Sequence, residues 1–172
     1  MARYSTSVVS QTAQLAGVNS ALTVNGYIGY WGASSGSGFR LRRLLLGVRT
    51  TTAVVPTSQQ ITVGIYRQTT APAGTGLASA VLGQALETHT PTDPTTGLIV
   101  TTATAIGTTA PVLAAQPISS PTFNSQSYLD VPMDYIEELV VGSGAANGLA
   151  FVNIGNTLPA GHFITITAEI EV

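Results

Sequence analysis

Residues 39–50 read FRLRRLLLGVRT and are the strongest strand candidate in the chain. Successive side chains of a strand point to opposite faces, so Phe39, Leu41 and Leu45 are expected to share one face. The opposite face is expected to carry Arg40, Arg42, Leu44, Leu46 and Val48. The pattern therefore predicts a strand that opens with arginines and buries its middle through leucines.

Two further segments have the same two-residue period. Residues 60–67 (QITVGIYR) place three β-branched side chains on one face: Ile61, Val63 and Ile65. We expect this strand to neighbour residues 39–50, with a connecting loop through Pro56. In the closing segment 162–172, Phe163 lies opposite a row of apolar side chains: Ile164, Ile166, Ala168, Ile170 and Val172.

The rest of the chain is also rich in strand-forming residues. It contains 25 threonines, and β-branched side chains favour strands over helices. Further β-like runs lie at residues 21–31, 84–90, 98–106, 122–131, 136–141 and 148–154, separated by segments rich in glycine and proline. No long helix is expected, although residues 132–138 leave room for one short helix.

These segments predict an all-β fold of about eight short strands with long loops. The expected architecture is an antiparallel two-sheet β-sandwich of the jelly-roll type. Residues 1–20 have no core pattern, so we expect an N-terminal arm that orders on a neighbouring molecule. Residues 21–172 are expected to form a single β-sandwich domain.

Charge is scarce and unevenly distributed along the chain. The six positive side chains, all arginine, lie at or before Arg67, and the eight carboxylates lie at or after Glu87. Only 8% of residues are charged, so most of the surface is expected to be neutral, which suits packing against protein. A net charge of −2 and one small arginine cluster argue against binding to nucleic acid.

Other compositional features exclude further classes of protein. Cysteine is absent, which excludes disulfide bonds and thiolate metal sites. No apolar stretch approaches the ~18 residues that span a bilayer, so no membrane association is expected. The N-terminus lacks the apolar core of a secretory signal, and we expect the protein to be made in a cytoplasm.

Few residues suggest catalysis. The segment from Gly32 to Gly36 matches G-x-S-x-G, with Ser34 in the nucleophile position. That motif needs a following helix, whereas a glycine-rich loop and a strand follow here. The two histidines, His89 and His162, are expected at the surface. We therefore expect no enzyme and no cofactor.

The acidic cluster of the chain consists of four residues: Asp130, Asp134, Glu137 and Glu138. Such carboxylates can bind Ca²⁺, but the segment lacks a calcium-loop motif, so solvated turn residues are expected instead. The cluster has a second interpretation together with Arg40 and Arg42. These arginines pair either with the acidic segment of a neighbouring subunit or with carboxylates across strands of their own chain.

Three aromatic residues, Tyr27, Tyr30 and Trp31, lie just before the glycine-rich loop. Tyr27 and Trp31 have the same parity and Tyr30 the opposite one, so at least one ring is expected to face outward. Two interpretations of Tyr30 and Trp31 stay open. The rings either anchor an interface or fill a core that is otherwise built from small residues.

Several segments between residues 38 and 172 carry a family resemblance: Arg40 to Leu44, Val63 to Arg67, Phe123 to Tyr128, Glu137 to Val141, Ala146 to Phe151, and the alternating C-terminal strand that ends in Glu-Val. In these segments the chain resembles small virion proteins of tailed phages, namely head decoration, or cement, proteins of jelly-roll type. The absence of lysine also fits a high-GC genome. The resemblance implies clustering, commonly as trimers, on the outer surface of an icosahedral capsid, and it implies no catalytic residue.

The leading hypothesis is therefore a non-enzymatic virion protein that binds the major capsid protein as a homo-oligomer, expected to be a trimer, and stabilises the shell. Several modest interfaces in each trimer would add through effective concentration. The alternative is a carbohydrate- or receptor-binding module, such as a tail-fibre tip or a lectin-like sandwich, that uses Tyr27, Tyr30 and Trp31. A third class, a small hydrolase, depends on Ser34.

Overall fold

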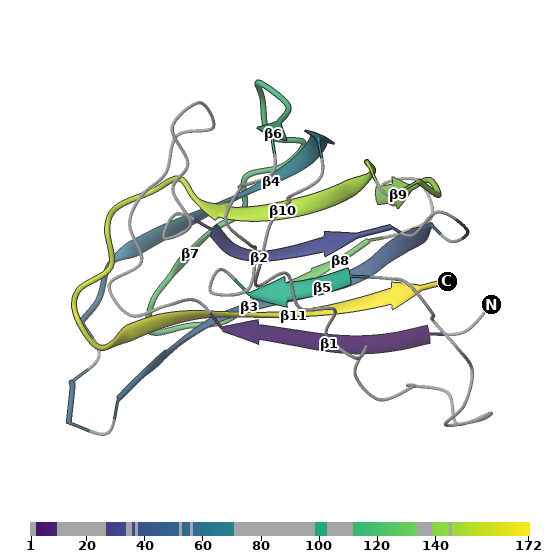
Figure 1. Ribbon diagram of the computed structural model, residues 1–172. Coiled ribbons are helices and arrows are strands. Elements are labelled where there is room, and N and C mark those ends of the chain that lie inside the picture. Colours follow the sequence, from purple (N-terminus) through teal and green to yellow (C-terminus); the bar gives the residue numbers. More distant parts are fainter. Residues whose placement is uncertain are drawn as a thin grey trace.

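The computed structural model describes residues 3–9, 27–33, 36, 38–51, 53–55, 57–70, 99–102, 112–133, 139–144 and 146–172. Over these ranges the regular structure is entirely β, as the sequence predicted, and no helix occurs in them. The strands form two antiparallel sheets, the arrangement of a β-sandwich (Figure 1). Within the same ranges there is no helix that is long and apolar enough to cross a membrane.

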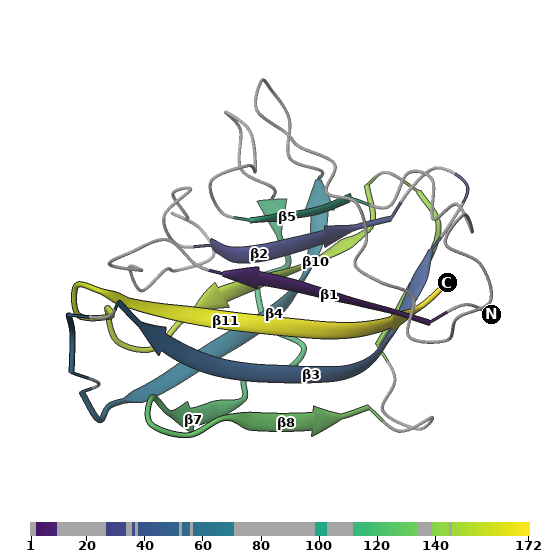
Figure 2. The same ribbon diagram turned by 90° about the horizontal axis from the view of Figure 1, so that it is seen from below.

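Sheet I contains the first and last strands of the chain. Its strands are β1 (Arg3–Val9), β11 (His162–Glu171), β3 (Phe39–Thr50) and β8 (Leu129–Pro132), in that spatial order, with β9 (Leu139–Val141) also paired to β3. Strand β11 covers one edge of β3 from Arg40 to Thr50, so β8 and β9 share the other edge. Figure 2 shows β1, β11, β3 and β8 side by side.

Sheet II contains the remaining strands. Its spatial order is β5 (Ile99–Thr102), β2 (Tyr27–Gly32), β10 (Gly148–Asn153), β4 (Gln60–Thr70) and β6 (Val112–Leu113), with β7 (Thr122–Asn124) also paired to β4. Strand β10 is the central strand, and each of its six residues is buried. Strands β6 and β7 lie at the end of the order, along the edge of β4 that β10 leaves open.

One hydrophobic core lies between the two sheets. The alternation predicted for β11 is confirmed, since Ile164 and Ile166 are fully buried while Phe163 and Thr165 are partly exposed. The alternation predicted for β4 is confirmed in the same way, because its three β-branched residues are 0% exposed: Ile61, Val63 and Ile65. Burial of each such side chain stabilises the fold by about 1.5–3 kcal/mol.

The faces predicted for β3 are wrong beyond Arg42, because the strand contains a bulge. Glu169 of β11 pairs with Arg43 while the next residue, Ile170, pairs with Leu41, so Arg42 is an extra residue. A bulge of this kind reverses the alternation that follows it. Phe39 and Leu41 therefore point into the core together with Leu44 and Leu46, and Leu45 lies on the outer face with Arg42 and Arg43.

The expected pairing of β3 with β4 is also wrong. The two strands belong to different sheets, and the loop from residue 51 to residue 59 connects one sheet to the other. Each strand has one strongly apolar face, and these faces are buried most completely when they oppose each other across the core. The sequence pattern gives the two faces but does not distinguish side-by-side from face-to-face placement.

Other predicted boundaries differ in detail. The run 122–131 is two strands, β7 and β8, which a turn divides between the two sheets. Residues 3–9 of the predicted arm form β1, which pairs with β11 of the same chain over seven residues. The expected strand at 84–90 and residues 134–138 of the expected short helix lie outside the described residues. The limits of the arm and of the domain stay predictions.

Candidate functional site

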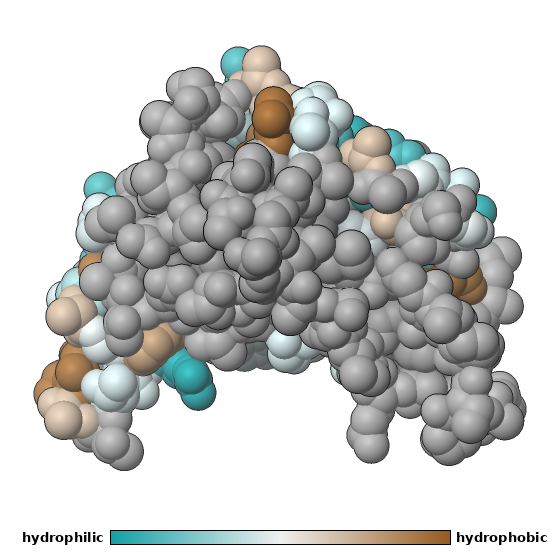
Figure 3. Space-filling model, viewed as in Figure 1, coloured by the Kyte–Doolittle hydropathy of each residue, from teal (hydrophilic) through white to brown (hydrophobic). Residues whose placement is uncertain are grey.

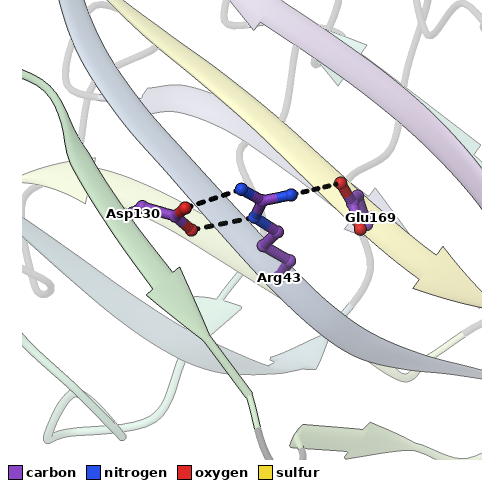
Figure 4. Close-up of polar contacts among 3 residues, drawn as sticks. All are labelled: Arg43, Asp130 and Glu169. Atoms are coloured by element: carbon purple, nitrogen blue, oxygen red, sulfur yellow. Dashed lines mark hydrogen bonds and ion pairs between the residues drawn. The ribbon is translucent and has the colours of Figure 1, made fainter.

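Arg43 is the centre of an ion-pair cluster on the outer face of sheet I. Its Nε and Nη2 donate to Oδ1 and Oδ2 of Asp130, at 2.9 and 2.6 Å, and its Nη1 donates to Oε1 of Glu169 at 3.3 Å. Figure 4 shows the guanidinium of β3 between a carboxylate of β8 and a carboxylate of β11. The two parallel bonds to Asp130 give this pair a fixed geometry.

The strand registers explain why these three side chains meet. Glu169 pairs directly with Arg43, and Asp130 pairs with Leu45, the next outward-facing residue of β3. The hydrogen bonds from Arg43 lower the pKa of Asp130 below its ordinary value, and the same bonds raise the pKa of Arg43. Both side chains are partly exposed, at 41% and 34%, so water screens the pair.

Arg42 makes a second ion pair, which is buried. Its Nε donates to Oε2 of Glu171 at 2.6 Å, and the two side chains are only 10% and 8% exposed. Arg42 is the extra residue of the bulge, and its guanidinium lies on the outer face of sheet I, as that of its neighbour Arg43 does. Glu171 also pairs in register with Arg40, so the end of β11 lies against arginines of β3.

The structure therefore supports the second interpretation of the charges, in which they pair across strands of one chain. Arg42, proposed from the sequence as an interface residue, contacts Glu171 of its own chain, and Asp130 contacts Arg43. Sequence analysis did not select Arg43, Glu169 or Glu171. Two features of the sequence could have indicated these residues: the Arg-Arg pair inside an apolar strand, and the two glutamates in the last strand. Asp134, Glu137 and Glu138 lie outside the described residues.

Trp31 belongs to the core. It is 1% exposed, and its ring contacts Phe151 edge to face, with centroids 4.6 Å apart and an angle of 75° between the planes. The expected interface role of Trp31 is corrected accordingly, because a ring enclosed between the sheets cannot contact a partner. Its Nε1 atom has no hydrogen-bond partner within the described part of the chain. The side chains of Tyr27 and Tyr30 lie outside the description.

His162 is also buried, contrary to the expected surface position. It is 1% exposed, and its Nε2 accepts a hydrogen bond from the backbone N–H of Thr57 at 3.1 Å. Its Nδ1 lies 3.4 Å from the carbonyl oxygen of Ala160. These contacts assign His162 to anchoring the loop between β3 and β4. His89 and Ser34 lie outside the described residues.

A groove of about 620 Å³ lies at the end of sheet I where β11 begins. Strand residues line one side and loop or turn residues line the other: Gly47, Val48, Thr50 and Thr165 against Val55 and residues 125–128. Two of these side chains are strongly exposed, Tyr128 at 77% and Val55 at 83%. Figure 3 shows apolar surface at the lower left, where the loop between β3 and β4 projects.

Hydrogen bonds fix the turn that carries Tyr128. Asn124 accepts from the backbone N–H of Gln126 through its side chain and from the N–H of Ser127 through its carbonyl, both at 2.9 Å. The hydroxyl of Ser125 donates to the carbonyl of Thr57 at 2.5 Å and accepts from the N–H of Gln59 at 3.0 Å. The turn is thus bonded to the loop between β3 and β4, which contributes Val55 to the same side of the groove.

A second surface of interest is the edge of sheet II formed by residues 112–124, which we call the neutral edge. This segment (VLAAQPISSPTFN) contains no charged residue. It exposes two large apolar side chains, Val112 at 55% and Ile118 at 39%. Thr122 is exposed as well, and its hydroxyl lies 3.0 Å from that of Thr62 on β4.

Comparisons with known proteins add no assignment. No family model matches the chain, and no curated protein sequence matches it.

Proposed function

We propose that this chain is a non-enzymatic head decoration, or cement, protein of a tailed phage, which binds the outer capsid surface as an oligomer and stabilises the shell. The observation that carries the proposal is the neutral edge, an exposed and uncharged strip with apolar side chains at Val112 and Ile118. A partner can cover such a strip without removing charges from water, which is the costly step in burying polar surface.

The finer fold that we propose is a jelly roll, and the strand pairing supports it. Strand β1 pairs with β11, β2 with β10, β3 with β8 and β9, and β4 with β6 and β7. The pairs are nested: the first strand pairs with the last, the second with the one before the last, and so on toward the middle of the chain. Strands β6 and β7 can be counted as one interrupted strand, and so can β8 and β9. Each sheet then has four strands, and β5 is an additional strand at the edge of sheet II. Jelly rolls have this eight-stranded form and occur in viral capsid proteins.

The fold alone does not establish the role, because one architecture serves many functions. Support for assembly comes from the surface of the described residues. Arg42, Arg43, Asp130, Glu169 and Glu171 are paired within the chain, so they contribute little free charge. The proposed partner is the major capsid protein, and the proposed oligomer is a trimer, whose several weak contacts would combine into stable binding.

Binding to capsids tests the proposal. Purified chain is mixed with capsids of the phage that encodes it, prepared without this protein, and the mixture is sedimented. We expect the wild-type chain to sediment with the capsids, and Val112→Arg and Ile118→Arg each to weaken binding about tenfold by adding a buried charge without a partner. Val140→Arg, at an exposed valine of β9 in sheet I, is the matched control and should bind normally.

The possible results separate the parts of the proposal. A wild-type chain that stays in the supernatant at every concentration would refute the capsid role. Wild-type binding that survives both edge substitutions would retain the role but exclude the neutral edge as the contact. Light scattering of the chain in solution measures the oligomer, and a monomer that binds capsids singly would exclude the trimer.

A further inference from the structure

We propose that the groove beside Tyr128 binds a neutral saccharide, with the apolar face of a sugar ring against the tyrosine ring. The inference does not depend on capsid binding, because Val112 and Ile118, the exposed apolar side chains of the neutral edge, are not among the residues that line the groove. The ligand class follows from the size, the charge and the polar groups of the groove.

The size of the groove suits a small sugar. Its volume of about 620 Å³ lies inside the usual range for small-molecule sites, ~300–1,000 Å³. Gly47 contributes to this space because it has no side chain. A Cβ atom at Gly47 would approach Oγ1 of Thr165 to 3.2 Å, so the floor of the groove is closed tightly between β3 and β11.

The described lining residues carry no charge, which favours a neutral ligand. The nearest charged groups along the same face are engaged elsewhere. Arg49, two residues after Gly47, lies over the ring of Phe163, with 5.1 Å between its Cζ and the ring centroid. Asp130, two residues after Tyr128, is held by Arg43. An anionic ligand would therefore find no cation within the lining itself.

The polar groups in the groove match sugar hydroxyls. Thr50, Ser127 and Thr165 bring hydroxyls that can both donate and accept, and Gln126 brings an amide. The Ser127 hydroxyl donates to the carbonyl of Asn124 at 3.0 Å and so presents its lone pairs as acceptors. Saccharide hydroxyls also have both capacities, so they pair with such groups more completely than an apolar ligand would.

Tyr128 supplies the stacking surface. Its side chain is 77% exposed, although a tyrosine ring of this size is normally largely covered. The turn that carries it is held by Asn124 and Ser125, and the neighbouring loop is held by the bond from Thr57 to His162. A turn and a loop that are already ordered lower the entropy lost on binding.

The test is a titration of ¹⁵N-labelled protein with neutral methyl pyranosides of glucose, galactose, mannose and N-acetylglucosamine and with their common disaccharides, to tens of millimolar, followed by backbone amide shifts. We expect at least one of these sugars to shift amides of residues 47–50, 125–128 and 165 and not those of residues 112–118 of the neutral edge. Millimolar dissociation constants are sufficient for this measurement.

Two substitutions and a control locate the binding. Tyr128→Ala should weaken binding about tenfold or more, whereas Tyr128→Phe, which retains the ring, should stay within about threefold of the wild type. Tyr128 is so exposed that neither change affects folding, which thermal unfolding verifies. Val140→Ala removes an exposed apolar group outside the groove and should bind as the wild type does.

Each of three results would overturn the proposal. The first is that no sugar in the panel shifts the groove amides. The second is that Tyr128→Ala binds the active sugar as tightly as Tyr128→Phe. The third is that an acidic sugar, methyl glucuronide, titrated in the same way, binds more tightly than every neutral sugar of the panel. If sugars fail and Tyr128→Ala instead abolishes sedimentation with capsids, the groove is a protein contact, and the capsid role stands while the saccharide site does not.

Discussion

At the scale of single residues, two adjacent arginines of β3 make ion pairs of very different character. The Arg42–Glu171 pair is buried, with side chains 10% and 8% exposed, whereas Arg43 and Asp130 are exposed at 41% and 34%. A buried charge depends on its partner because the interior cannot solvate it, while an exposed charge can be solvated by water. Loss of one partner should therefore have unequal consequences in the two pairs.

The first prediction concerns the buried pair. Arg42→Met should lower the free energy of unfolding by about 3 kcal/mol because it leaves the Glu171 carboxylate buried without this partner. This value is the low end of the range of about 3–5 kcal/mol for the loss of one partner of a buried ion pair, because Arg40 also pairs in register with Glu171. Arg42→Met combined with Glu171→Met should recover most of the loss. Urea denaturation of both single variants and the double variant measures the coupling, and strictly additive losses would contradict it.

The second prediction concerns pH. Hydrogen bonds from Arg43 hold the pKa of Asp130 below its ordinary value of about 4. The unfolded chain therefore takes up a proton at a higher pH than the folded chain does, and the stability due to this pair is lost as the pH falls through the folded-state pKa. The stability advantage of the wild type over Asp130→Asn should be constant near neutral pH and shrink below about pH 4.

Urea denaturation of the two proteins across this pH range measures the advantage. Glu169→Gln serves as the comparison, since its single bond to Arg43 is longer, at 3.3 Å. An advantage of the wild type over Asp130→Asn that does not change between neutral and acidic pH would show that the carboxylate of Asp130 has no altered pKa in the folded chain.

At the scale of elements, the bulge in β3 determines which side chains reach the core. Leu41 and Leu44 are three positions apart, yet both are buried, at 1% and 0%. A regular strand would place them on opposite faces. The extra residue, Arg42, lets the strand keep leucines inward on both sides of the Arg-Arg pair and keep both arginines outward.

The third prediction is that deleting Arg42 destabilises the protein about as much as Arg42→Met does. The deletion removes the bulge and joins Leu41 directly to Arg43, so regular alternation keeps Phe39 and Leu41 inward with Leu44, and the register with β11 is unchanged. Both variants lose the ion pair to Glu171, at a cost of about 3 kcal/mol. Urea denaturation compares the two variants, and a much larger loss for the deletion would mean that the core of sheet I depends on the bulge.

At the scale of the whole molecule, the topology explains the division of charge along the chain. The arginines lie in early strands and the carboxylates lie late in the sequence, but sheet I places these strands alternately, in the order β1, β11, β3, β8. Early strands therefore lie beside late ones throughout the sheet. Charges that are separated along the sequence therefore lie beside each other in the sheet. Arg42 and Arg43 of β3 accordingly contact carboxylates of β11 and β8.

The same alternation affects the outer surface. The ion pairs engage Arg42, Arg43, Asp130, Glu169 and Glu171 within the chain, and the neutral edge and the groove beside Tyr128 contain no charged residue. The capsid and saccharide proposals draw on these two surfaces, whose key side chains, Ile118 and Tyr128, belong to different segments. Arginine substitution at Ile118 and alanine substitution at Tyr128 should therefore give separate effects, one on capsid binding and one on sugar binding.

Local sequence patterns are sufficient to predict the secondary structure class and much of the core. Threonine-rich composition and two-residue alternation predicted an all-β chain, and the buried faces of β4 and β11 follow that alternation at Ile61, Val63, Ile65, Ile164 and Ile166. These features are local, because the position of a side chain relative to its neighbours in a strand fixes the face to which it points.

The strands that lie beside each other and the charges that meet depend on the three-dimensional fold and do not follow from local patterns. The partner of Arg42 is 129 positions away and that of Arg43 is 87 positions away, and no local pattern encodes such distances. Trp31, His162 and Tyr128 show the same limit. The first two are buried and the third is exposed, because burial depends on what the opposite sheet and the connecting loops cover rather than on the residues next in sequence.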